Sequence, residues 1–149
     1  MLPPVQFRPF EEDDLYEVLR LANETLDESY EGGLFLHFAR LYPEGFIVAT
    51  EGEEIIGFVL GTIQRAYEAR ILALAVKPSW RRKGIATQLT ERFLERFARF
   101  GVRRVTLEVR VSNEPAIGLY QRMGFEKKGM LERYYGDGED AYVMALTLG

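Results

Sequence analysis

The sequence of 149 residues has no cysteine, which excludes disulfide bonds, thiolate metal ligands and a cysteine nucleophile. His37 is the only histidine, so a multi-histidine metal site and most histidine-based catalytic triads are excluded as well. No apolar run approaches the roughly 18 residues of a membrane span, and no signal-peptide pattern opens the chain. From these absences we expect a cytoplasmic protein with no metal site and no membrane contact.

Length and composition indicate one globular domain over residues 1–149. A domain of this size buries about 68–70% of the surface that its unfolded chain exposes, which is enough for a core without disulfides or metals. The hydrophobic fraction of 47% and the charged fraction of 28% fit an ordinary globular protein. No shift of composition along the chain marks a second domain.

The net charge of −4 hides an uneven distribution of charged side chains. Residues 1–60 carry 3 basic and 13 acidic side chains, whereas residues 76–110 carry 10 basic and 3 acidic ones. The basic segment therefore either meets an anionic partner or forms a solvated basic face. Nucleic-acid patches usually carry exposed aromatic rings as well, but Phe93 and Phe97 lie on the predicted buried stripe of a helix. We therefore expect no nucleic-acid partner.

Apolar periodicity and turn residues predict the order strand, two helices, three strands, helix, strand, helix and two strands. Strands are expected over residues 5–9, 46–50, 54–64, 69–76 and 103–111 and in two runs within 125–148, and helices over 11–26, 34–45, 84–100 and 112–124. This order is typical of a mixed α/β sheet with helices packed on it. In residues 103–111 the apolar side chains alternate with Thr106, Glu108 and Arg110, so these three share a polar face.

The turn that begins at Ser79 places three cations, Arg81, Arg82 and Lys83, directly before a predicted helix. A helix N-terminus already carries a partial positive charge, so cations there are unfavourable. The same N-terminus has backbone N–H groups without partners, which favour an anion, and Gly84 lets the backbone approach a ligand closely. Charge alone leaves two interpretations open, an exposed basic loop or a site for a di- or triphosphate.

The string RRKGIA, Arg81 to Ala86, fits the R/Q-x-x-G-x-G/A motif of the GNAT acetyltransferases, which the chain closely resembles. It stands in that family's order, after a strand with the sequence LALAV and before a helix. LEVRVSNEPAIGLYQRMGF resembles the family's fifth strand and fourth helix, and the resemblance is tightest from Ile71 to Leu146. RYYGDGEDAYVMAL is similar to the C-terminal strands of the branch that contains the ribosomal-protein alanine acetyltransferases and the archaeal N-terminal acetyltransferases.

The resemblance implies the GNAT fold, an α/β (α+β) domain with a mixed, mostly antiparallel central sheet of about seven strands and about four helices. It also implies acetyl-coenzyme A as the cosubstrate and no metal. In the family the turn binds the pyrophosphate and the strand before it holds the pantetheine arm. The matching residues here are Arg81, Arg82, Lys83, Gly84, Ile85, Ala86 and Thr87 in the turn, and Leu74, Ala75 and Val76 in the strand. Asn113 matches an asparagine that contacts the coenzyme, and it is also a plausible helix N-cap.

Acetyl transfer from a thioester needs a neutral amine and a proton for the departing thiolate. A protein α-amine has a pKa near 8, so a carboxylate that acts through water is a sufficient base. From the pattern alone Glu108 is a solvated strand residue and Tyr120 a core residue. The resemblance instead implies that Glu108 is the general base. It also implies that Tyr120, twelve residues later, is the general acid and a contact of the coenzyme.

Tyr134 and Tyr135 are either edge-strand aromatics or, as the resemblance implies, residues that bind the first residues of a peptide substrate. The implied function is transfer of an acetyl group to the N-terminal α-amine of a protein or peptide, by a monomer or a homodimer. One alternative is a GNAT enzyme that acts on a small-molecule amine or a lysine side chain. Another is a non-catalytic relative that binds coenzyme A.

Two features depart from the family pattern. Arg70 stands near a position where some eukaryotic relatives have a catalytic tyrosine, which argues against that variant mechanism here. The segment from Asp27 to Leu41 matches no motif, although it is expected to form one wall of the peptide cleft. Tyr30, Glu31 and Leu34 are its candidate contacts with the substrate.

Overall fold

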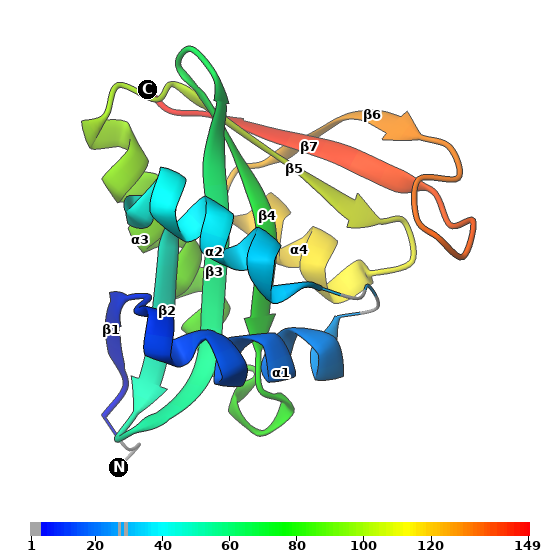
Figure 1. Cartoon of the computed structure of the whole chain (residues 1–149). Coiled ribbons are helices and arrows are strands. Elements are labelled where there is room, and N and C mark those ends of the chain that lie inside the picture. Colours follow the sequence, from blue (N-terminus) through cyan, green and yellow to red (C-terminus); the bar gives the residue numbers. More distant parts are fainter. Residues whose placement is uncertain (1–3, 27, 29) are drawn as a thin grey trace.

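The computed structural model describes residues 4–26, 28 and 30–149, and its elements follow the predicted order (Figure 1). The strands are β1 (Gln6–Pro9), β2 (Phe46–Glu51), β3 (Glu54–Arg65), β4 (Glu68–Val76), β5 (Arg104–Arg110), β6 (Glu126–Leu131) and β7 (Ala141–Thr147). The α-helices are α1 (Leu15–Thr25), α2 (Gly32–Leu41), α3 (Ile85–Arg99) and α4 (Glu114–Arg122). Asp27 and Ser29, in the segment expected to wall the peptide cleft, lie outside the described residues.

The seven strands form one sheet in the order β1-β2-β3-β4-β5-β7-β6. Within the described chain the neighbouring strands pair antiparallel, except for β4 and β5, which are parallel. The predicted mixed, mostly antiparallel sheet is thus confirmed. The parallel pairing is short, because it runs only from Glu68 opposite Arg104 to Arg70 opposite Thr106. Beyond these residues β4 stays with β3 while β5 stays with β7, and the two strands separate (Figure 1).

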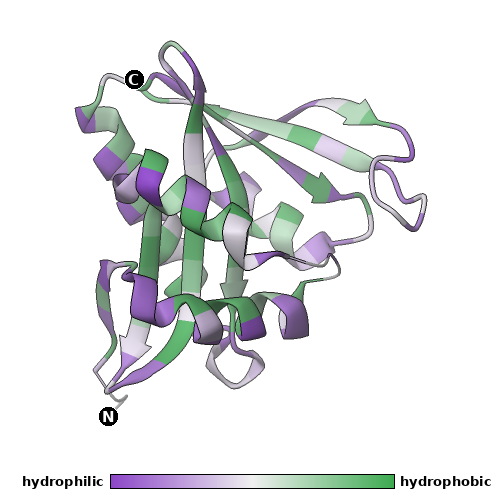
Figure 2. Cartoon of the chain, viewed as in Figure 1, coloured by the Kyte–Doolittle hydropathy of each residue, from purple (hydrophilic) through white to green (hydrophobic). Residues whose placement is uncertain are grey.

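Two hydrophobic cores lie on opposite faces of the sheet. One packs α1 and α2 against β2 and β3, with Val18, Phe35 and Phe58 fully or almost fully buried. The other packs α3 and α4 against the sheet through residues that include Leu89 and Ile117. Hydrophobic residues accordingly concentrate along the central strands (Figure 2). The sheet lies between two layers of helices. Packing on both of its faces keeps β4 and β5 apart where they separate.

Helix α3 confirms the predicted amphipathic pattern. Ile85, Leu89, Phe93 and Phe97 are its buried stripe, and the Phe93 and Phe97 rings lie 4.4 Å apart, tilted edge to face. Gly84 is the N-cap in a left-handed conformation, with φ of 80°, a geometry that glycine adopts without a steric penalty. The stripe anchors the helix, so the position of its N-terminus is fixed by the core.

Several predicted boundaries are wrong. The second helix, expected over residues 34–45, is α2 (Gly32–Leu41) followed by a separate 3-10 turn at Pro43–Gly45, because a proline cannot continue the helix. The first helix, expected from residue 11, begins as a 3-10 turn at Glu12–Asp14, because the Asp14 carboxylate accepts hydrogen bonds from Arg8 (2.7 and 2.8 Å) and from the backbone N–H of Glu11 (2.8 Å). Strand β5 ends at Arg110 rather than at Val111, whose N–H donates to the carbonyl of Asp140 in the next loop (3.2 Å).

The described part of the chain contains no helix long and apolar enough to cross a membrane. Among the same residues, no group of three or more histidine, cysteine, aspartate or glutamate side chains is arranged to hold a metal ion.

Gly61 in β3 packs directly against α3. A Cβ atom at Gly61 would lie 2.3 and 2.4 Å from two ring atoms of Phe93 and 2.7 Å from the carbonyl oxygen of Arg70. We expect Gly61→Ala to lower the free energy of unfolding by about 1–3 kcal/mol, because a buried ring and a strand must move. Urea unfolding of the purified variant measures this.

Gly129 in β6 is the matched control, since a Cβ there meets nothing within 4 Å. Gly129→Ala should leave the free energy of unfolding within about 0.5 kcal/mol of the starting protein. Equal losses for the two variants would contradict the proposed close packing at Gly61.

Candidate active site

Two adjoining clefts lie where β4 and β5 separate. The first, here the Glu108 cleft, has a volume of about 540 Å³ and the second, the α3 cleft, about 880 Å³. The α3 cleft runs along the start of α3, and the Glu108 cleft reaches the loop between β6 and β7. The residues that line both are Thr25, Leu26, Leu74, Arg110, Asn113, Ala116 and Tyr120. The clefts therefore form one continuous passage with Tyr120 at the junction.

The α3 cleft brings together almost every residue predicted to bind the coenzyme. These residues are Leu74, Ala75, Val76, Arg81, Arg82, Gly84, Ile85, Ala86, Thr87, Asn113 and Tyr120. Lys83 is the exception, because its Nζ donates to the carbonyl of Ser79 (3.4 Å) and lies 5.5 Å from the centre of the Trp80 ring. It lines neither cleft.

The turn before α3 exposes backbone N–H groups to its cleft. The first helical hydrogen bond runs from the N–H of Gln88 to the carbonyl of Gly84 (3.0 Å), and Gly84 provides no side-chain cap. The N–H groups of Ile85, Ala86 and Thr87 therefore have no partner inside the helix. Arg82 has a φ of 63°, a conformation uncommon outside glycine. The turn is thus held in a shape that suits an anion at the helix N-terminus.

Asn113 is the N-cap of α4, as predicted. Its Oδ1 accepts a hydrogen bond from the N–H of Ala116 (3.3 Å). The cap uses the oxygen and leaves the side-chain amide nitrogen available to a ligand, so the capping and ligand-binding roles are compatible.

Glu108 is not a solvated strand residue. Its side chain is 13% exposed, and its Oε1 accepts hydrogen bonds from Arg70 Nη2 and from the hydroxyl of Tyr134 (3.3 Å). Thr106, on the same predicted polar face, is buried and accepts a hydrogen bond from Gln64 Nε2 (3.1 Å). On this polar face Glu108 and Arg110 therefore line the cleft, while Thr106 is buried beside it.

Tyr120 is a core residue and a cleft residue at once. Its ring packs edge to face on Phe125 at 5.4 Å, and only 7% of the residue is exposed. Burial, with a smaller contribution from Tyr135, raises the pKa of the Tyr120 hydroxyl above its ordinary value. The hydroxyl therefore stays protonated at neutral and mildly alkaline pH.

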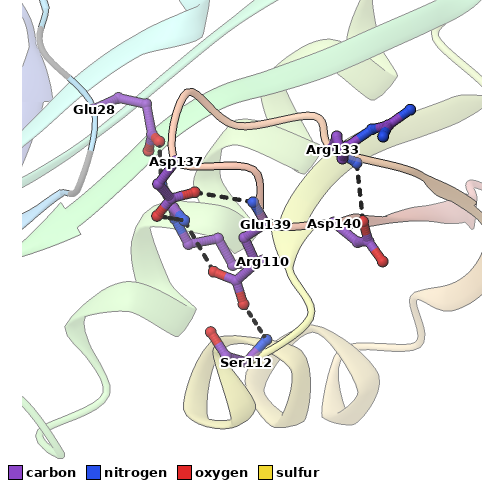
Figure 3. A network of polar contacts seen from close by, with 7 residues as sticks. All are labelled: Glu28, Arg110, Ser112, Arg133, Asp137, Glu139 and Asp140. Carbon is purple, nitrogen blue, oxygen red and sulfur yellow. Dashed lines mark hydrogen bonds and ion pairs between the residues drawn. The ribbon is translucent and has the colours of Figure 1, made fainter.

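Arg110 fixes the wall of the Glu108 cleft opposite β4. The guanidinium pairs with Glu28 between α1 and α2, and with Asp137 (2.8 Å) and Glu139 (2.9 Å) between β6 and β7 (Figure 3). It also lies over the ring of Tyr135, 4.1 Å from the ring centre. The Arg110 side chain is only 10% exposed. One buried cation thus ties two loops that are far apart in the sequence to β5.

Tyr134 and Tyr135 belong to the tied loop rather than to an edge strand. Both backbone N–H groups donate to the carbonyl of Glu139 (3.1 and 3.2 Å), and their rings pack edge to face at 5.0 Å. The Glu139 carboxylate, in turn, accepts from the N–H of Ser112 (3.0 Å, Figure 3). Hydrogen bonds from Ser112 and, to a lesser extent, Arg110 lower the pKa of the Glu139 carboxyl group. The carboxylate therefore stays ionised, and keeps its contacts with the loop, at mildly acidic pH.

Several lining residues were missed by sequence reasoning, namely Glu28, Trp80, Arg110 and Arg122. Arg110 had a usable signal, since alternation places it on the same face as Glu108. Glu28 lies in the segment expected to wall the cleft and Arg122 in the stretch that resembles the family's fourth helix, but no residue spacing singled out either side chain. Of the candidate contacts in the segment 27–41, Tyr30 lines the Glu108 cleft, while Glu31 and Leu34 are exposed and line neither cleft.

Comparison with known proteins places this geometry in a family. Residues 12–125 match the acetyltransferase (GNAT) family. An N-alpha-acetyltransferase of Saccharolobus solfataricus is 34% identical over 148 residues, which cover 91% of this chain and 89% of the relative. The crystal structure of Ard1 from Thermoplasma volcanium has a TM-score of 0.94 and 36% identity, covering 97% of this chain and 98% of that one.

The ribosomal-protein-S18-alanine N-acetyltransferase of Escherichia coli is also similar, with a TM-score of 0.84 and 27% identity over 98% of this chain and 95% of that chain. The similarity to both predicted groups of relatives, archaeal and ribosomal-protein acetyltransferases, is thus confirmed. Family match, sheet topology and the motif turn agree with one another. The chain belongs to the acetyltransferase (GNAT) family and is an acetyl-coenzyme A-dependent acetyltransferase.

Proposed function

We propose that the chain transfers the acetyl group of acetyl-coenzyme A to the N-terminal α-amine of a protein or peptide. The observation that carries this proposal is the junction of the two clefts at Tyr120. The motif turn lies on one side of it, and Glu108 with the tyrosine pair lies on the other. A thioester entering from the α3 cleft would meet an amine entering from the Glu108 cleft. The names of the similar N-alpha-acetyltransferases support a peptide α-amine as the acceptor.

The α3 cleft fits both the anionic and the extended parts of acetyl-coenzyme A. The N–H groups at the start of α3, together with Arg81 and Arg82, suit the pyrophosphate. Beyond Arg70 the side of β4 that faces β5 has no strand partner, so backbone groups of Leu74 and Ala75 are available to the amides of the pantetheine arm. The Val76 carbonyl accepts a hydrogen bond from Arg81 Nε (3.3 Å). The cosubstrate thereby replaces the strand pairing that β4 and β5 do not make.

The proposed reaction uses one proton acceptor and one proton donor. The amine nitrogen attacks the thioester carbonyl carbon, the C–N bond forms and the C–S bond breaks. Glu108 takes the proton that the amine loses, directly or through one water. Tyr120 gives its hydroxyl proton to the departing thiolate, and exchange with solvent restores both groups.

The Glu108 cleft suits an extended peptide better than the alternative acceptors. Tyr134 and Tyr135 lie on a loop that Arg110 holds in place, which gives an acceptor a defined wall. A lysine side chain, with a pKa near 10.4, would also be harder for a carboxylate to deprotonate than an α-amine near 8. A small-molecule amine meets the same chemistry, and the following assay separates it from a peptide.

The acceptor is tested by incubating the protein with acetyl-coenzyme A and peptides that differ in their first residue. Mass spectrometry should find one acetyl group on the N-terminal nitrogen of at least one peptide. The matched control is the same peptide with a blocked N-terminus and an internal lysine, which should remain unmodified. Acetylation of a polyamine but of no peptide would overturn the proposed acceptor.

The role of Tyr120 predicts a specific pH behaviour. Because burial raises its pKa, the hydroxyl is protonated across pH 6–9, and its loss should matter equally at every pH in that range. Tyr120→Phe is therefore expected to lower kcat by about 100-fold, within the usual range for a general acid, without changing the shape of the pH–rate profile. Unchanged turnover across this range would mean that Tyr120 is not the acid.

The backbone at Gly84 should contribute more to cosubstrate binding than the neighbouring charges. Gly84→Val forces a β-branched residue into a left-handed conformation and displaces the N–H groups of α3. We expect the KM for acetyl-coenzyme A to rise about tenfold or more, whereas Arg82→Ala, which removes one exposed charge, should raise it only a few-fold. Initial rates at saturating peptide measure both; equal effects would indicate that charge, not the backbone, binds the pyrophosphate.

A further inference from the structure

Arg70 occupies the last position at which β4 still pairs with β5, opposite Thr106. Its side chain is one third exposed and lines the Glu108 cleft. Its Nε is buried and has no hydrogen-bond partner among the described residues. Burial of an unpaired guanidinium nitrogen costs free energy. The hydrogen bonds that Nη2 donates indicate what offsets this cost.

Arg70, Glu108 and Tyr134 form a closed triangle of polar contacts. Arg70 Nη2 donates both to Glu108 Oε1 and to the Tyr134 hydroxyl oxygen (3.0 Å), and the Tyr134 hydroxyl donates to the same Oε1 (3.3 Å). The three residues come from β4, from β5 and from the loop between β6 and β7. The triangle thus spans the opening between the strands and fixes the Glu108 carboxylate from two directions.

Both contacts are made to one oxygen of Glu108. Within the described part of the chain Oε2 accepts no hydrogen bond. A carboxylate oxygen accepts up to two hydrogen bonds, so Oε1 is used by Arg70 and Tyr134 while Oε2 is available. The contacts at Oε1 position the carboxylate, and Oε2 can accept a proton.

We propose that Arg70 is a positioning residue for Glu108, which holds Oε1 so that Oε2 accepts the proton of the incoming amine. This inference rests on the proposed function of Glu108 as the base. Arg70 differs from a catalytic tyrosine at this place, because a guanidinium stays protonated and cannot itself act as the base. Its role is to orient the base and to balance its charge.

The charge balance has a consequence for the substrate. A lone carboxylate beside an amine favours the ammonium form, and an ammonium nitrogen has no lone pair with which to attack the thioester. The positive charge of Arg70 beside Glu108 weakens this stabilisation of the ammonium. Removal of Arg70 should therefore slow the chemical step without weakening the binding of the peptide.

A second ion pair across the same two strands provides a matched control. Arg104 of β5 pairs with Glu68 of β4 at 2.8 Å, at the other end of the short parallel ladder, and neither residue lines a cleft. Arg104→Gln breaks a β4–β5 ion pair as Arg70→Gln does, but away from the proposed base. The two variants separate a loss of strand pairing from a loss of positioning.

The experiment measures kcat and both KM values of the full chain for Arg70→Gln, Arg70→Lys and Arg104→Gln, with the best amine acceptor found in the peptide assay. Arg70→Gln should lower kcat about 10- to 100-fold, the scale of a misplaced catalytic group, with the KM for acetyl-coenzyme A unchanged and that for the acceptor unchanged or lower. Arg70→Lys, which keeps the charge but not the fork, should fall between. Arg104→Gln should keep kcat within about twofold.

Glu108→Gln, alone and combined with Arg70→Gln, completes the test. If Arg70 acts through Glu108, the double variant should be no slower than Glu108→Gln alone. The positioning role would be overturned if the two losses in kcat multiplied in the double variant. It would also be overturned if Arg70→Gln kept kcat within twofold of the starting protein while Glu108→Gln was inactive. Either result would leave the proposed base intact. An active Glu108→Gln would overturn both, and a preference for small amines would overturn only the proposed acceptor.

Discussion

The separation of β4 from β5 beyond Arg70 and Thr106 is the constraint on which the rest of the site depends. Parallel neighbours in a sheet normally satisfy each other's backbone groups, but here the ladder stops after three residue pairs. The two strands stay apart because each is bound to its other neighbour and each face of the sheet is covered by helices. The opening therefore presents unpaired backbone to a ligand instead of to a strand.

The charged residues of the site divide between holding the structure and meeting the ligands. Arg110 pairs with carboxylates of two loops and lies over a tyrosine ring. Arg70 donates hydrogen bonds to Glu108 and Tyr134. Arg82, by contrast, has no hydrogen-bond or ion-pair partner among the residues that the structure describes, and it lines the α3 cleft. Within the basic segment of residues 76–110, Arg110 thus organises the cleft, whereas Arg82 remains available to an anionic cosubstrate.

Local signals were enough to predict most of the fold and the cosubstrate turn. The apolar stripe of α3, the alternation in β5 and the cap at Asn113 each depend on side chains a few residues apart. What local signals could not predict has a different origin. Lys83 looked equivalent to its neighbours, but it is directed to Ser79 and Trp80, and a contact of that kind depends on turn geometry that no residue spacing encodes.

By itself, then, the sequence determined the order of elements, the amphipathic faces and the GNAT motif, because helix and strand periodicities and a glycine at a helix start are properties of contiguous residues. Only the tertiary structure decided what surrounds Glu108. Its partners Arg70 and Tyr134 are 38 residues before it and 26 residues after it, and Arg110 meets Glu28 across 82 residues. Such pairings are set by sheet order and loop packing, which bring distant side chains together in a way that no local pattern records.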